Sequence, residues 1–109
     1  MDSFIPQPYG ARKIDPNGKA IVPYDLITSG VSPQSLMLWL TLDTLREGNQ
    51  WVTVPEDDLA KYLKVTIRSV QRYIAELRDA GWLEISKDMR TMTNCYKLIG
   101  TYEQGRKAA

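Results

Sequence analysis

Histidine is absent from this 109-residue chain, and cysteine occurs once, at Cys95. The chain therefore lacks the usual general base and the commonest metal ligand, and it cannot form an internal disulfide or a cysteine-ligated zinc site. No stretch approaches the ~20 apolar residues of a membrane span, and the first residues lack the pattern of a signal peptide. We expect a cytoplasmic protein with no metal, no cofactor, no membrane partner and no small-molecule ligand.

The sequence also contains few residues or motifs typical of an enzyme active site. It contains no glycine-rich phosphate loop and no nucleophile elbow. Its acidic run, Glu56-Asp57-Asp58, precedes an expected helix, where carboxylates interact favourably with the positive end of the helix dipole. The expected function is therefore non-catalytic.

Length and composition indicate one small domain. The chain has 109 residues, of which 43% are hydrophobic, enough for one modest core. Residues 1–31 are expected to form an irregular arm, because prolines and the turn signal Asp15-Pro16-Asn17-Gly18 disfavour helix. Residues 32–99 would form the domain. Residues 100–109 lack periodicity and would be a flexible tail.

Three helices are predicted within the domain. Ser32 and Pro33 are typical of the N-cap and first residue of a helix that extends to about Arg46. After the turn Lys64-Val65, Thr66 is typical of a second N-cap. The two helices on either side of this turn have apolar residues spaced for one buried face: Leu59, Ala60 and Leu63 in the first, Val70, Ile74 and Leu77 in the second.

Short strands are predicted around this helical pair. Residues 83–86 and 94–99 alternate between apolar and polar side chains, as half-buried strands do, and residues 87–93 would join them in a hairpin. Residues 51–54 provide a third short strand. The aromatic residues of these segments are expected in the core: Trp51, Trp82 and Tyr96.

The order of these elements resembles the winged helix-turn-helix family of DNA-binding proteins. The resemblance covers about residues 32–99 and depends on the helix-turn-helix of residues 58–83, in which Ala80-Gly81-Trp82-Leu83 leads into the hairpin. It implies an α+β fold with a three-helix core, a small antiparallel sheet and an irregular N-terminal arm. It also implies that the helix beginning after Thr66 reads DNA, while the hairpin, or wing, contacts the backbone or minor groove.

Basic residues gather in the segment that holds this helix and wing. Residues 61–97 contain eight basic and four acidic residues, whereas residues 1–60 contain four basic and eight acidic ones. Such polarity suits a protein that orients itself on DNA, although an uneven surface also arises by chance.

Arg68, Gln71 and Arg72 are spaced three or four residues apart, so they share one helix face, from which Arg can pair with guanine and Gln with adenine. Arg72 could instead pair with Glu76 on the surface, and Ile67 could contact a thymine methyl or pack. The candidate reading residues are Thr66, Ile67, Arg68, Ser69, Gln71 and Arg72. The candidate backbone and wing contacts are Lys64, Lys87, Arg90, Thr91 and Thr93.

The first helix is more apolar than one buried face requires. Leu36, Trp39 and Leu40 are candidates for contact with the N-terminal arm, with a second copy in a homodimer, or with both. A protein-interaction module that uses this face is therefore the alternative function.

The favoured function is sequence-specific binding of double-stranded DNA. The segment that leads into the first helix, residues 22–33, is similar to the one in phage and plasmid replication-initiator winged helices. The short chain is similar to small bacterial regulators. Either a transcriptional regulator or the DNA-docking module of a replication initiator is therefore expected, associated with the nucleoid of a bacterial or phage-infected cell.

Overall fold

The computed structural model describes residues 22–101. Most of the predicted arm and tail thus lie outside the described residues. The elements follow in the order α2 (Tyr24–Thr28), α3 (Pro33–Arg46), β1 (Trp51–Thr53), α4 (Glu56–Leu63), α5 (Ile67–Asp79), β2 (Leu83–Asp88) and β3 (Thr93–Leu98). No helix among residues 22–101 is long and apolar enough to cross a membrane.

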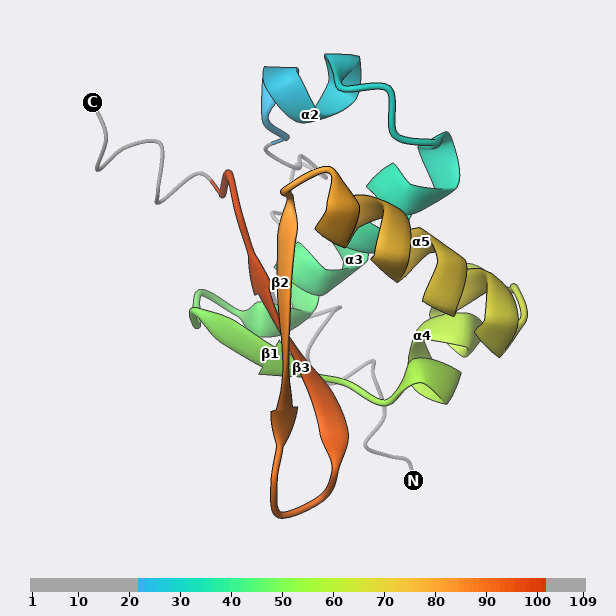
Figure 1. Ribbon diagram of the computed structural model, residues 1–109, viewed down its shortest axis with the longest axis vertical. Coiled ribbons are helices and arrows are strands. Elements are labelled where there is room, and N and C mark those ends of the chain that lie inside the picture. The colour runs from blue at the N-terminus through green and yellow to red at the C-terminus, as the bar shows by residue number, and fades with distance from the viewer. Residues whose placement is uncertain (1–21, 102–109) are drawn as a thin grey trace.

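The strands form one antiparallel sheet in the order β1-β3-β2, so that β3 lies in the middle. Helix α3 packs against α4, α5 and the sheet, and α5 also contacts β2. The loop between β2 and β3 extends away from the helices, at the opposite end of the molecule from α2 (Figure 1). This arrangement is the predicted α+β winged-helix fold, with α3, α4 and α5 as the three-helix core.

The predicted caps explain where the two longest helices begin. The Ser32 side chain accepts a hydrogen bond from the Ser35 N–H at 3.2 Å, and the Thr66 side chain accepts one from the Ser69 N–H at 3.1 Å. Each satisfies a backbone donor that a helix start would otherwise leave free. Gly81, with φ of 88°, ends α5 in the left-handed region that glycine adopts without strain.

Part of the predicted irregular arm is helical. Helix α2 begins after Pro23, whose carbonyl accepts hydrogen bonds from the N–H groups of Leu26 and Ile27. Leu26 is fully buried in the core, and this burial holds the short helix against the domain.

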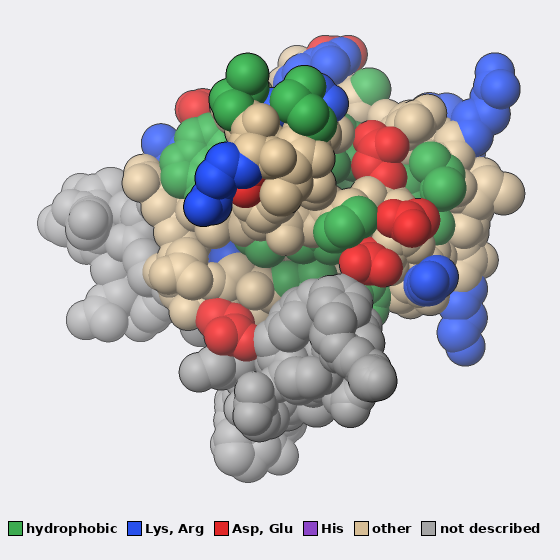
Figure 2. Space-filling model, turned by 90° about the horizontal axis from the view of Figure 1, so that it is seen from below, with side chains coloured by type: hydrophobic (Ala, Val, Ile, Leu, Met, Phe, Trp, Pro, Cys, Tyr) green, Lys and Arg blue, Asp and Glu red, His purple; other side chains and the backbone are tan. Residues whose placement is uncertain are grey.

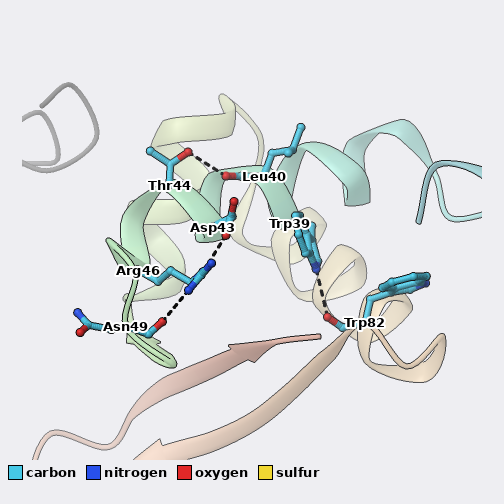
Figure 3. Close-up of polar contacts among 7 residues, drawn as sticks. All are labelled: Trp39, Leu40, Asp43, Thr44, Arg46, Asn49 and Trp82. Carbon is cyan, nitrogen blue, oxygen red and sulfur yellow. Dashed lines mark hydrogen bonds and ion pairs between the residues drawn. The ribbon is translucent and has the colours of Figure 1, made fainter. Parts of the chain in front are cut away.

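Trp39 lies inside the chain's own core. Its side chain is 0% exposed, and its indole N–H donates to the Trp82 carbonyl at 3.3 Å, joining α3 to the start of the hairpin (Figure 3). Trp39 therefore presents no exposed side-chain surface to a second copy, and contact of this helix face with the N-terminal arm or with a second copy stays a prediction. Leu36 and Leu40 are half-buried and pack against the core.

The expectation that Trp51 belongs to the core is wrong. Its side chain is 39% exposed, because successive side chains of a strand point to opposite faces and Val52 takes the inward position in β1. Tyr96 is fully buried as expected, and Trp82 is half-buried against the core.

The end of α3 and the start of β1 are joined by a charged side chain. The Arg46 guanidinium donates to an Asp43 carboxylate oxygen at 2.7 Å and to the Asn49 carbonyl at 3.1 Å (Figure 3). Glu47 between them has a left-handed φ of 52° and ends the helix. These contacts hold the turn that places the sheet beneath the helices.

Candidate nucleic-acid interface

Helix α5 has one buried face and one open face. Val70, Tyr73, Ile74 and Leu77 are buried in the core. The opposite face is exposed, and its first turns carry four of the predicted reading residues: Ile67, Arg68, Gln71 and Arg72. The α4–α5 turn supports this orientation, because the Val65 N–H donates to the Ala60 carbonyl at 3.0 Å and Lys64 takes a left-handed φ of 58°.

The Arg68 side chain has no hydrogen bond or ion pair with another residue of the described range 22–101. Ile67 is 44% exposed, so its side chain lies at the surface rather than in the core. Thr66 is exposed and Ser69 is half-buried, and their hydroxyls bond each other at 3.1 Å as part of the helix cap. A guanidinium held at an open helix face can reach a base or a phosphate.

Arg72 and Glu76 do not form the surface pair that their spacing allows. The Glu76 carboxylate instead accepts hydrogen bonds from the Ser32 N–H at 3.1 Å, the Ser32 hydroxyl at 2.9 Å and the Ser35 hydroxyl. The Ser35 bond is the main cause of a lowered Glu76 pKa, and the positive charge of Arg72 contributes less. The Arg72 guanidinium lies 5.5 Å from the centre of the Tyr73 ring, a cation–π distance.

The wing loop is held by its own aspartate. An Asp88 carboxylate oxygen accepts from the Arg90 N–H at 2.9 Å, and the Arg90 guanidinium lies 3.6 Å from the same oxygen. The backbone hydrogen bond from Arg90 is the first cause of a lowered Asp88 pKa. The Arg90 side chain is nevertheless 90% exposed, so it can leave Asp88 for a phosphate at small cost.

The other wing candidates are divided between the strands and the tip. Lys87 donates to the Met92 carbonyl at 3.4 Å, and Thr91 accepts from the Thr93 N–H at 3.3 Å. Thr91 is exposed, whereas Thr93 is half-buried. Met92 is 57% exposed beside them. The tip therefore presents apolar as well as polar side chains.

A hollow of about 440 Å³ separates α5 from the wing. It brings together three of the predicted contacts, Gln71 from α5 with Lys87 and Thr93 from the hairpin. The rest of its lining is Pro55, Glu56, Met92 and Asn94. Arg68, Arg72 and Arg90 are not part of this lining, and Lys64 lies at the far end of α4.

Glu56 and Asn94 were not identified from the sequence as members of this surface. The Glu56 carboxylate accepts from the Gln71 side-chain amide at 3.0 Å and from the Asn94 side-chain amide at 3.3 Å. Glu56 precedes Gln71 by 15 residues and Asn94 by 38, so no helical or strand periodicity links them. Only the folded arrangement of α4, α5 and β3 brings the three together.

Positive charge is spread over the wing end rather than concentrated. Figure 2 shows this end of the molecule, with Lys and Arg side chains lying apart from one another and Asp and Glu side chains among them. A surface of this kind can hold single phosphates, and its long-range attraction for DNA is weak.

Comparison with known proteins supports the fold. No protein-family model matches the chain, and no match to a curated protein sequence was found. Among solved structures, the chain is similar to one described as a possible transcriptional regulator from Methanosarcina mazei Go1, with a TM-score of 0.52 and 24% sequence identity. The similarity covers 86% of this chain and 78% of that chain, and at this identity it concerns the fold alone.

Proposed function

We propose that the protein binds double-stranded DNA sequence-specifically and without catalysis, with α5 in the major groove and the wing against the backbone. The observation that carries this proposal is the open face of α5, on which Arg68, Gln71 and Arg72 are exposed while the opposite face is fixed in the core. A major groove about 12 Å wide admits one α-helix, and these side-chain types pair with guanine and adenine edges.

The wing supports the same mode of binding. Lys87 lines the hollow next to Gln71 of α5, Arg90 lies in the loop at the tip of the hairpin, and both are exposed. With Lys64, they provide three cations for phosphates, and Arg68 and Arg72 of α5 raise the number to five. Each neutralised phosphate steepens the salt dependence, so log K should fall against log salt with a slope of about −3 to −4.5.

The regulator and the replication-initiator roles both follow from such binding. The proposed partner is duplex DNA, and a homodimer would be revealed by an inverted repeat with half-sites about 10 bp apart or a multiple of that. The alternative, a protein-interaction module that uses the first-helix face, loses its central residue because Trp39 is buried in the core.

Selection of bound sites from random duplexes, followed by fluorescence anisotropy at several salt concentrations, tests the proposal. We expect an enriched sequence motif and an affinity for it that falls with salt along the stated slope. Absence of binding to the selected duplexes at low salt would contradict DNA binding, and binding without any enriched motif would contradict sequence-specific reading.

A further inference from the structure

Glu56 places a carboxylate within the surface that we propose for DNA. It lies in the first turn of α4, lines the hollow between α5 and the wing, and is half-buried. One of its oxygens bonds Gln71 and the other bonds Asn94, so both acceptor atoms are engaged with side chains of the same surface.

This contact determines how the Gln71 amide is oriented. An ionised carboxylate only accepts hydrogen bonds, so the atom of Gln71 that faces Glu56 must be the side-chain nitrogen. The Gln71 carbonyl oxygen and the second hydrogen on that nitrogen remain for another partner. Together they form an acceptor beside a donor, the pattern that matches the amino group and ring nitrogen of adenine.

Asn94 holds Glu56 from the other side. Its side-chain nitrogen donates to Glu56 at 3.3 Å and to the Tyr96 hydroxyl at 3.2 Å, and Tyr96 is fully buried. The chain of contacts therefore runs from the rigid core through Asn94 and Glu56 to Gln71. A glutamine on an exposed helix face would otherwise lose side-chain freedom on binding a base.

We propose that Glu56 is a positioning residue for base reading: it fixes the Gln71 amide in the orientation that selects adenine, while its negative charge weakens binding to every duplex. This inference rests on the proposed DNA-binding function. It gives Glu56 two effects that a purely structural residue would not combine, lower affinity for DNA in general and higher discrimination at one base pair.

The substitution Glu56→Gln separates these two effects when Asp57→Asn is the control. Asp57 is the next residue along the same helical turn, is exposed, and has no hydrogen bond to Gln71. Both variants remove one negative charge beside the proposed interface, so both should bind a random duplex about 2- to 5-fold more tightly at low salt.

Only Glu56→Gln should lower the preference for the adenine at the position that Gln71 reads. A well-formed bidentate pair discriminates about 5- to 150-fold. Gln71 and Asn94 bond different oxygens of Glu56, and a neutral amide at residue 56 replaces one of these acceptors with a donor nitrogen. We expect the preference for adenine to fall about 5-fold or more in Glu56→Gln and in Glu56→Ala, and to stay unchanged in Asp57→Asn. Equal preference in wild type and both Glu56 variants would overturn the inference.

A double-mutant cycle with Gln71→Ala tests whether Glu56 affects the base preference through Gln71. If Glu56 acts through Gln71, then Glu56→Gln should not reduce the preference further in the Gln71→Ala background. A loss of preference in the Gln71→Ala background as large as the loss in the wild-type background would overturn the inference.

Circular dichroism and thermal melting of each variant check that the fold is kept. A wild-type protein that binds no duplex would refute the proposed function itself, whereas unchanged preference in the variants of a wild type that does discriminate refutes only the role of Glu56.

Discussion

Substitution of Glu76 should destabilise the domain by detaching α5 from the start of α3. Its carboxylate accepts the Ser32 N–H at 3.1 Å and the Ser32 hydroxyl at 2.9 Å, together with the hydroxyl of Ser35, which is fully buried. Hydrogen bonds to charged groups contribute about 1.5–3 kcal/mol each and are not additive. We expect Glu76→Ala to lower the free energy of unfolding by about 3 kcal/mol, and Glu76→Gln by about 1–2 kcal/mol, because the amide retains one acceptor.

The pH dependence gives a second, sharper test of this network. The Glu76 pKa is lowered below its usual value of 4.5, first by the Ser35 hydroxyl. A depressed pKa stabilises the fold above pH 4.5, and this contribution is lost as the pH falls through the folded-state value. The difference in unfolding free energy between wild type and Glu76→Gln should therefore be full at pH 7 and shrink progressively below pH 4.5.

Urea unfolding of wild type, Glu76→Ala, Glu76→Gln and Ser35→Ala between pH 3 and pH 7 measures these quantities. For a domain of this size, each 1 kcal/mol corresponds to a change in Tm of about 4–8 °C. Ser35→Ala should also weaken the pH dependence, because it removes the main cause of the lowered pKa. A loss of unfolding free energy below about 0.5 kcal/mol in Glu76→Ala would refute the reasoning. So would a difference in unfolding free energy between wild type and Glu76→Gln that does not change with pH.

Three further predictions concern single side chains. Arg68→Ala should lower affinity for the selected duplex and relax the preference at one base pair by about 1–3 kcal/mol, with Tm nearly unchanged. The control Arg78→Ala removes a cation that pairs with Asp79 at the far end of α5, and it should not alter that base preference. Arg90→Ala should weaken binding to all duplexes alike and reduce the salt slope by about 1; a changed base preference would contradict a phosphate contact. Trp39→Ala should cost about 3–5 kcal/mol in urea unfolding, and a loss under 1 kcal/mol would contradict its place in the core.

Most of the fold could be predicted from the sequence because its signals are local. The side chains of Ser32 and Thr66 cap the helices that follow them by accepting from the backbone N–H three residues on. The apolar spacing of residues 70–77 identifies the buried face of α5 without any tertiary information. The alternation of β2 and β3 likewise reports which strand faces are buried.

The expectations from the sequence differ from the structure at residues whose burial depends on other elements of the fold. Trp51 and Trp39 are both large aromatic residues in apolar segments, but Trp51 is on the outer face of an edge strand, whereas Trp39 is enclosed between α3 and the hairpin. Leu26 forms part of a helix because the core covers it, which the surrounding prolines and glycines do not indicate.

Only part of the candidate site could be predicted from the sequence. The exposed face of α5 follows from helix periodicity, so Arg68, Gln71 and Arg72 could be proposed from spacing alone. The acceptor for Gln71 could not, because Glu56 reads locally as one of three acidic residues that favour a helix start. Its role depends on the distance between separate elements.

The most direct test of the central claim is a titration of isotopically labelled protein with a selected duplex, followed by amide chemical shifts in NMR spectra. If the open face of α5 enters a groove, the largest shifts should occur at residues 66–72 and at wing residues 87–93, and they should diminish as salt is raised. Shifts confined to α2 and α3, or no shifts at low salt, would contradict the account.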